Sequence, residues 1–311
     1  MAAPATDVSA VLVEGPWRHR LVAAHGARFH VAELGSGPLV LLLHDFPQFW
    51  WAWRAQLVAL AAAGYRAVAM DLRGYGASDK PPRGYDTPTS AADAAALVRA
   101  LGERDAVVVG HGVSGRTAWA LPSLHPGQVR AVAVVGAAHP LVTHRVLLDR
   151  LRGGGPDGAR GSLGTTAAAL ARQLPVLPER RLVHGDGVER VLRSRSAPGW
   201  PHPRDVERYA QAVRVPFVAH SALEHHRWAA RSAVRADGRR FAAALRAGTR
   251  VPVLQVRGEL DPTVGPAALA ASGRYAHGPH RVVQVPGAGH YVPEEAPERL
   301  TGVLTGWLAG L

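Results

Sequence analysis

Residues 107–115 could place a nucleophile at a sharp turn, but the nucleophile itself is absent. The segment reads Val-Val-Val-Gly-His-Gly-Val-Ser-Gly. Where a buried strand turns abruptly into a helix, the pattern Gly-x-Nuc-x-Gly exposes a catalytic Ser, Asp or Cys at the tip. Gly112 holds that tip position in this chain. Because glycine readily adopts the backbone angles of such a turn, Gly112 keeps the turn and removes the chemistry.

Polar residues also follow other predicted strands. The motifs are His44-Asp45-Phe46-Pro47, the segment from Asp71 to Ser78, Gly258-Glu259-Leu260-Asp261-Pro262 and Gly287-Ala288-Gly289-His290. Open α/β sheets place their functional sites at the carboxyl ends of the strands. We therefore expect these motifs to meet at one edge of a sheet.

The elements that must position these residues alternate along the chain. Predicted strands occupy residues 18–23, 28–34, 39–43, 66–70, 106–109, 130–135, 251–256 and 281–285. Predicted helices occupy residues 51–63, 91–101, 113–124 and 266–271, followed by a C-terminal helix. Alternation of this kind indicates βαβ units and a mostly parallel sheet. The first two strands, joined by His25-Gly26-Ala27, predict an antiparallel edge.

The alternation fails between about residues 141 and 249. This stretch has helical and loop-like patterns and contains Gly153-Gly154-Gly155-Pro156 as a breaker. We predict a helical cap over 141–249, inserted into a core domain formed by 1–140 and 250–311.

Composition limits the class of protein. Of 311 residues, 47% are hydrophobic and 19% are charged, which is typical of a globular domain. There are no cysteines, so disulfides, thiolate catalysis and cysteine-ligated metals are excluded. The start of the chain lacks a signal-peptide pattern, and the apolar runs are too short to span a bilayer. We expect a cytoplasmic protein that does not associate with membranes.

The formal charge of +12 raises nucleic acid as a partner. The arginines are spread along the chain, however, without the interleaved aromatic residues that single-strand binders use. We therefore expect dispersed surface charge and no nucleic-acid partner. The sequence leaves the oligomeric state open.

Taken together, these motifs resemble the α/β-hydrolase superfamily, and its epoxide-hydrolase-like branch in particular, over residues 17–308. The run from His44 to Arg54 resembles the branch's His-Gly-x-Pro-x-x-Trp-x-x-Trp-Arg segment, and the run from Asp71 to Ser78 resembles its Asp-x-Arg-Gly-x-Gly-x-Ser loop. The resemblance implies an α/β-hydrolase fold, in which a mostly parallel twisted sheet is flanked by helices and carries an inserted helical cap. It also implies a small-molecule substrate and no cofactor.

The resemblance assigns roles to individual residues. Asp261 would be the acid that orients His290, and His290 would be the base. The backbone N–H groups of Phe46 and Val113 would stabilise an oxyanion.

The chain departs from the branch at the tip of the turn and at two positions of the cap motifs. Members of the branch carry Asp at the turn, and esterase relatives carry Ser, where this chain has Gly112. The cap motifs place Ala171 and His226 where two tyrosines would hydrogen-bond the epoxide oxygen. Histidine can still donate a hydrogen bond, whereas alanine cannot. We do not expect Ser114, two residues into the following helix, to replace the missing nucleophile.

Asp45 replaces the glycine of the usual His-Gly-x-Pro turn. We expect its side chain to point away from the site or to bond nearby backbone, as Asp does in turns. The alternative is that it approaches the vacant position as a substitute carboxylate. We expect His44 and His111 to be structural residues. No His-x-x-x-His or carboxylate pairing predicts a metal site.

Three hypotheses remain for a protein that binds a small, largely apolar molecule beneath its cap. The first is a non-covalent enzyme in which His290, oriented by Asp261, acts as a general base. The second is an inactive relative that binds its ligand without turnover. The third is an epoxide hydrolase or esterase whose nucleophile was removed by engineering. Gly112 argues against catalysis through a covalent enzyme intermediate.

Overall fold

The computed structural model describes residues 6–151 and 171–311, with side chains described outside 147–151. Within these residues, eight strands form one sheet in the order β1-β2-β4-β3-β5-β6-β7-β8. The strands are β1 (Arg18–Ala24), β2 (Ala27–Leu34), β3 (Leu39–Leu43), β4 (Arg66–Met70), β5 (Ala106–His111), β6 (Val129–Val135), β7 (Val253–Gly258) and β8 (His280–Val285).

The sheet is mostly parallel, as the sequence predicts. β1 and β2 form an antiparallel hairpin, β2 also pairs antiparallel with β4, and the remaining neighbours are parallel. Every residue of β3, β5 and β7 is buried. Continuous apolar runs are typical of strands covered on both faces, which explains why these central strands carry no alternating pattern.

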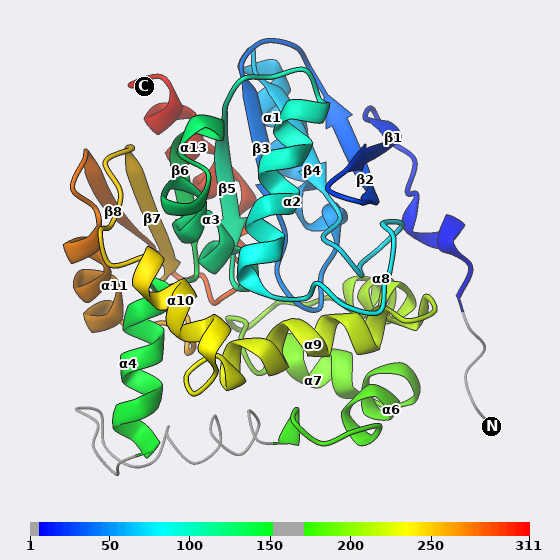
Figure 1. Cartoon of the computed structure of the whole chain (residues 1–311). Coiled ribbons are helices and arrows are strands. Elements are labelled where there is room, and N and C mark those ends of the chain that lie inside the picture. The colour runs from blue at the N-terminus through cyan, green and yellow to red at the C-terminus, as the bar shows by residue number, and fades with distance from the viewer. Residues whose placement is uncertain (1–5, 152–170) are drawn as a thin grey trace.

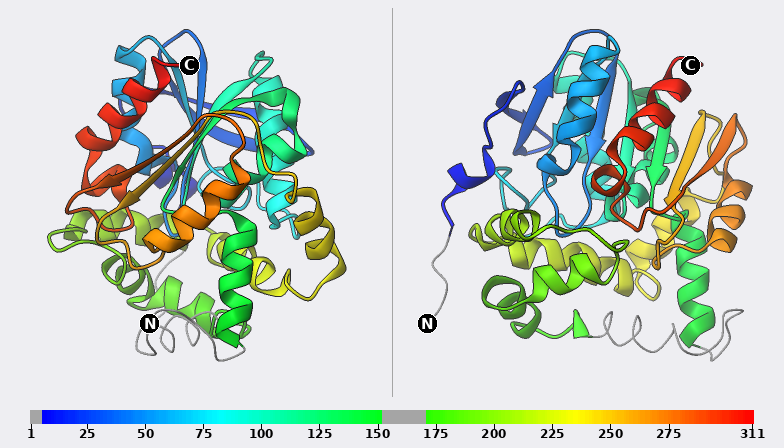
Figure 2. Two further views of the ribbon diagram at one scale, coloured as in Figure 1. Left: turned by 90° about the vertical axis from the view of Figure 1, so that its left-hand side faces the viewer. Right: turned by 180° about the vertical axis from the view of Figure 1, so that it is seen from behind.

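Helices cover both faces of the sheet. α2 (Thr87–Ala100) and α3 (Val113–Leu124) pack together on one face, and α1 (Arg54–Ala62) and α13 (Pro297–Leu308) pack together on the other (Figures 1 and 2). The other elements of the core are α11 (Pro266–Ser272), α12 (Val292–Glu295), η1 (Val8–Val11), η2 (Trp50–Trp53), η3 (Pro126–Gln128) and η4 (Gly273–Tyr275).

Between β6 and β7 the described chain is helical. It contains α4 (Pro140–Leu151), α6 (Leu177–His184), α7 (Gly187–Arg193), α8 (Pro203–Arg214), α9 (Val218–Arg231) and α10 (Ala236–Ala244). α6 to α9 form a layer beyond the ends to which the parallel strands point (Figure 1). This layer stands where the sequence predicts a cap, and residues 152–170 of the predicted cap lie outside the described residues.

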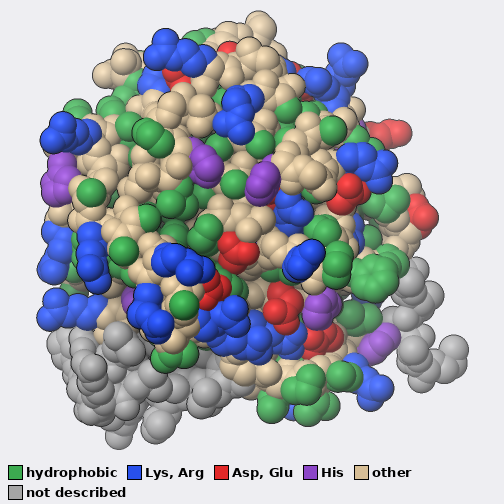
Figure 3. All heavy atoms as spheres, viewed as in Figure 1, with side chains coloured by type: hydrophobic (Ala, Val, Ile, Leu, Met, Phe, Trp, Pro, Cys, Tyr) green, Lys and Arg blue, Asp and Glu red, His purple; other side chains and the backbone are tan. Residues whose placement is uncertain are grey.

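Basic side chains are found in many places on the face of the molecule shown in Figure 3. On the face shown in Figure 3, Lys and Arg are spread over the molecule, with acidic side chains and histidines between them. None of the described helices is both long enough and apolar enough to cross a lipid bilayer.

Candidate active site

The turn between β5 and α3 has the geometry that the sequence predicts. β5 ends at His111, α3 begins at Val113, and Gly112 between them has φ of 53° and ψ of −109°. A side chain is strained at such positive φ, whereas glycine is not. A Cβ added to Gly112 would lie 2.1 Å from the carboxyl carbon of Asp45. Another group therefore already fills the space that a side chain at the tip would need.

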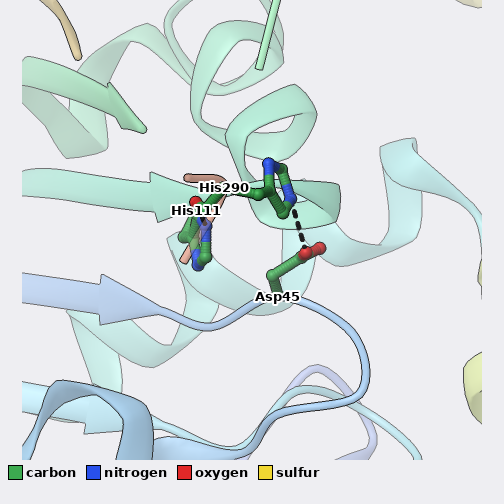
Figure 4. A group of neighbouring side chains, drawn as sticks. All are labelled: Asp45, His111 and His290. Atoms are coloured by element: carbon green, nitrogen blue, oxygen red, sulfur yellow. Dashed lines mark hydrogen bonds and ion pairs between the residues drawn. The ribbon is translucent and has the colours of Figure 1, made fainter. Parts of the chain in front are cut away.

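That group is the carboxylate of Asp45, which follows β3 and is buried. One oxygen, Oδ1, accepts a hydrogen bond of 2.6 Å from the backbone N–H of Val113. The other, Oδ2, lies 3.0 Å from His290 Nε2 (Figure 4). The Asp45 side chain therefore does not point away from the site; it bonds the backbone of Val113 and approaches the vacant position, as the alternative had it. The Asp45 carboxylate does not bond its own turn, because His290, which lies far away in the sequence, provides a buried partner of opposite charge.

The opposite side of the His290 ring contacts the predicted acid. His290 Nδ1 lies 2.9 Å from Asp261 Oδ2, so the imidazole is held between two carboxylates. Asp261 follows β7 and His290 follows β8, so the two parallel strands deliver both residues to the same edge of the sheet. The remaining oxygen of Asp261 accepts a hydrogen bond of 2.6 Å from Thr263 Oγ1. Thr263 was not singled out from the sequence.

A second carboxylate fixes the backbone around His290. Glu295 accepts hydrogen bonds from the backbone N–H groups of Gly289 and Tyr291, at 2.7 and 2.8 Å, and from that of Ala197 at 2.8 Å. It therefore joins the histidine loop to the segment that follows α7. The sequence offered no motif that would have revealed this role of Glu295.

The two carboxylates determine the charge of His290. Burial by itself lowers the pKa of His290, but the charges of Asp261 and Asp45 and their hydrogen bonds outweigh it and raise the pKa to about 9. Burial also works against ionised Asp45, and the hydrogen bond and charge of His290 outweigh it, so the pKa of Asp45 stays far below its usual range. At neutral pH the resting site therefore contains an ionised Asp45 and a protonated His290, which is not free to act as a base.

This ion pair should make stability depend on pH in a defined direction. The folded pKa of His290 lies above the unfolded value of about 6.5. The stabilisation is therefore fully present below the unfolded pKa and is lost as pH rises through about 9. We expect the difference in unfolding free energy between the wild type and Asp45→Asn, on the order of 1 kcal/mol at neutral pH, to shrink over this range. Urea unfolding at a series of pH values measures it.

Asp79→Asn provides the matched control for this titration. Asp79 pairs with Arg28 on the surface, and the arginine keeps its charge throughout the range. The effect of Asp79→Asn on the free energy of unfolding should therefore be the same at neutral pH and at a pH of about 9. A constant difference for Asp45→Asn as well would contradict the ion pair with His290.

Beside the carboxylate–imidazole group lies a cavity of about 340 Å³. Its lining includes Asp45, Gly112, Val113, Arg116, Gly136, Ala137, Ala138, Thr143, Val146, Arg172, Gln173, Arg195, His226, Ala229, Ala230, Thr263, Val264, Ala268 and His290. The lining is thus shared between the strand ends of the core and the helical segment that separates β6 from β7.

The cap residues singled out from the sequence have different places. His226 lines the cavity, and its Nε2 is buried without a hydrogen-bond partner. Burial, followed by the charges of neighbouring arginines, holds the pKa of His226 well below its usual range, so the ring is neutral. Ala171 is exposed and is not part of the lining, whereas the next residue, Arg172, is.

The remaining candidate residues are committed to the core. His44 Nδ1 lies 2.9 Å from the Asp45 carbonyl oxygen, and its Nε2 accepts from the Leu72 N–H. His111 Nε2 donates to the His290 carbonyl oxygen at 2.8 Å. Ser114 Oγ donates to the His44 carbonyl oxygen at 2.6 Å and is buried. Phe46 is buried, and its ring contacts that of His226.

One group among the described residues has the geometry to hold a metal ion, although the sequence predicted no metal site. It consists of Asp45, His111 and His290, whose ligand atoms lie within 4.8 Å of one another (Figure 4). Their atoms already bond to one another or to backbone: Asp45 to His290, and His111 Nε2 to the His290 carbonyl oxygen. The arrangement therefore fits the ion pair between Asp45 and His290 at least as well as a metal.

Comparison with known proteins gives a consistent family. Residues 38–297 match the family model described as alpha/beta hydrolase fold. Epoxide hydrolase A of Mycobacterium tuberculosis is 29% identical over 94% of this chain and 97% of its own. The AB hydrolase superfamily protein YfhM of Bacillus subtilis is 32% identical over 67% of this chain and 72% of its own.

Solved structures agree with the sequence relatives. An epoxide hydrolase from an endophytic Streptomyces superposes with a TM-score of 0.77 at 30% identity, covering 96% of both chains. Epoxide hydrolase A from Mycobacterium thermoresistibile gives a TM-score of 0.81 at 26% identity, covering 95% of this chain and 99% of its own. The chain therefore belongs to the α/β-hydrolase family and has epoxide hydrolases among its relatives.

Proposed function

We propose that the protein hydrolyses epoxides through a covalent ester on Asp45, with His290 transferring protons and Asp261 orienting His290. One observation carries the proposal. The Asp45 carboxylate lies where a side chain on Gly112 would project, with one oxygen on the Val113 N–H and the other on His290. Asp45 therefore supplies the nucleophilic carboxylate that is missing at position 112.

In the first step, an oxygen of Asp45 attacks a ring carbon of the epoxide. A bond forms between this oxygen and the carbon, the ring carbon–oxygen bond breaks, and the ring oxygen takes up a proton, which protonated His290 supplies. Esterification removes the negative charge of Asp45. Because this charge helps to raise the pKa of His290, its loss lowers that pKa and favours the neutral ring that the next step needs.

In the second step, His290 Nε2 accepts a proton from water, and the resulting hydroxide attacks the carboxyl carbon of the ester. The backbone N–H of Val113 already donates to Asp45 Oδ1, so it is placed to stabilise the oxyanion that forms there. Collapse of this intermediate expels the alkoxide of the diol, which keeps the oxygen through which Asp45 was bonded and takes the proton from His290. It leaves one oxygen from water in the Asp45 carboxyl group, whose hydroxyl proton passes to His290 and restores the ionised carboxylate.

Further support comes from the cavity and the relatives. His226 provides a neutral ring with an unpartnered Nε2 in the cavity, and in the tautomer protonated there it can donate to the ring oxygen. Two relatives aligned along nearly the whole chain are named epoxide hydrolases.

Labelled water tests the proposal directly. After many turnovers of a simple epoxide in water enriched in the heavy oxygen isotope, we expect the peptide that contains Asp45 to carry heavy oxygen. The label enters because each hydrolysis leaves one water oxygen in the carboxylate. Mass spectrometry of the digested protein measures the label, and a sample incubated without epoxide is the control.

The same measurement separates the other hypotheses. Direct attack of water activated by His290 would place the heavy oxygen in the diol and none in the protein. A protein that only binds its ligand would yield neither a labelled peptide nor diol. Either result would exclude Asp45 as a nucleophile for the epoxide tested.

A further inference from the structure

We infer that the substrate carries an anionic group, a carboxylate in the simplest case, and that Arg116 and Arg172 bind it. The inference rests on the proposed function for the identity of the reacting group. The anion site itself can be tested without turnover.

The first observation is the balance of charge around the cavity. Its lining contains three arginines, at positions 116, 172 and 195, besides His290, and its only acidic side chain among the described residues is Asp45. Asp45 and Asp261, which contact His290 at 3.0 and 2.9 Å, together carry two negative charges. These charges balance His290 and Arg195, and Arg195 lies 3.9 Å from Asp45. The positive charges of Arg116 and Arg172 are left over.

The second observation is that neither guanidinium group has a counterion among the side chains described. Within residues 6–146 and 171–311, neither Arg116 nor Arg172 forms an ion pair, and Arg116 Nε is buried without a hydrogen-bond partner. Other deeply placed arginines are paired: Arg73 with Asp93 at 2.6 Å and Arg227 with Glu179 at 2.7 Å. Arg116 and Arg172 are both half-buried. Because a charge that is largely removed from water is costly without a partner, two such charges at one cavity indicate that an anion completes the site.

The third observation is that Arg172 is held in place. Arg227, anchored by two carboxylates, donates from Nε to the Arg172 carbonyl oxygen at 2.8 Å and from Nη2 to the Leu174 carbonyl oxygen at 2.6 Å. The segment that carries Arg172 is therefore tied to α9. Arg116 lies on the first turn of α3, the helix that begins directly after Gly112. The two arginines thus approach the cavity from the cap and from the core.

The titration behaviour of both groups agrees with this arrangement. Burial, followed by the nearby charge of Arg195, lowers the pKa of Arg172 to about 10. Burial also lowers the pKa of Arg116. A bound carboxylate would relieve both effects by supplying the missing negative charge. Planar guanidinium groups also match the geometry of a carboxylate, which they bind through two parallel hydrogen bonds.

Binding of an unreactive acid tests the anion site independently of catalysis. We expect calorimetric titration to show that butyrate binds the wild type about tenfold or more tightly than butyramide, its neutral analogue. Arg116→Gln and Arg172→Gln should each weaken butyrate binding about tenfold and leave butyramide binding unchanged. Arg190→Gln is the matched control, because Arg190 lies exposed on α7 and pairs with Asp186 outside the cavity.

Thermal melting shows whether the two arginines are unpaired in the empty protein. Since neither has a counterion to lose, Arg116→Gln and Arg172→Gln should melt at or above the wild-type temperature. Arg227→Gln, which breaks two ion pairs, should melt below it. A fall in melting temperature for the first two variants as large as that for Arg227→Gln would overturn the inference.

Turnover then links the anion site to the reaction. We expect the wild type to prefer glycidate, an epoxide that carries a carboxylate, over glycidamide, and both cavity variants to lose this preference through kcat/KM. Equal butyrate and butyramide binding would overturn the anion site even if neutral epoxides are hydrolysed. Tight butyrate binding without hydrolysis of any epoxide would instead overturn the proposed function. An equal fall in kcat/KM for glycidate and glycidamide in the variants would show that the arginines serve the reaction and not the recognition of the anion.

Discussion

Asp45→Asn is expected to reduce epoxide hydrolysis by at least about 10³-fold, because an amide cannot replace the attacking carboxylate. It also leaves His290 without one of the two charges that hold its proton. Asparagine nearly matches aspartate in volume, so it can retain the hydrogen bond from the Val113 N–H while the chemistry is lost. The measurement is kcat/KM for a simple epoxide, together with single-turnover formation of the diol.

Two controls make the result interpretable. Asp79→Asn introduces the same chemical change on the surface and should retain full activity. Circular dichroism should show that Asp45→Asn is folded, since the contact between His290 and Asp261 does not require Asp45. Full activity in folded Asp45→Asn would exclude Asp45 as nucleophile and favour general-base catalysis by His290 alone. Loss of activity in Asp79→Asn would point to a global effect.

The fold could be predicted from local patterns. β3 and β5 are short apolar runs that end in turn signals, and a strand covered on both faces requires little else. The sequence also predicted that the turn at Gly112, Asp261 and His290 lie at the ends of strands, because each of them comes shortly after a strand. Parallel strands then bring the pair together, at 2.9 Å.

The direction of the Asp45 side chain could not be read in this way. Its partner His290 lies 245 residues away in sequence, and no local rule connects the two. A signal was nonetheless present. The motifs that the sequence resembles have glycine in the turn after the third strand and an acid at the tip of the turn before α3, and this chain has the reverse, Asp45 and Gly112. Such a reciprocal exchange indicates two positions that share one space.

The arginines of the cavity were missed for a different reason. Thirty-six basic residues spread along a chain suggest dispersed surface charge, and spacing alone does not show which of them face inward. Arg116 faces the cavity only because α3 begins directly at the turn, and Arg172 does so beside Ala171, the position singled out from the cap motif. Both assignments depend on how the helical segment between β6 and β7 packs against the ends of the strands.

Exchanging Asp45 and Gly112 should move the nucleophile from the turn after β3 to the turn after β5. Gly112→Asp alone is expected to be inactive, because its Cβ would lie 2.1 Å from the Asp45 carboxyl carbon and displace that group. Asp45→Gly alone should be inactive because no carboxylate remains at the position of the nucleophile, beside the Val113 N–H. The double variant removes the overlap and supplies a carboxylate at the elbow. We therefore expect its kcat/KM for a simple epoxide to exceed that of either single variant by at least about 10²-fold.

Stability and labelling give independent readouts of the exchange. A side chain at residue 112 must adopt φ near 53°, at a cost of about 1–3 kcal/mol in unfolding free energy. This strain is common to Gly112→Asp and the double variant, whereas the steric overlap and the repulsion between two carboxylates occur only in Gly112→Asp. The double variant should therefore be the more stable of the two in urea unfolding. Heavy oxygen from labelled water should appear in the peptide that contains residue 112 and no longer in the one that contains residue 45. A double variant no more active than Asp45→Gly would mean that the two positions are not interchangeable sources of one nucleophile.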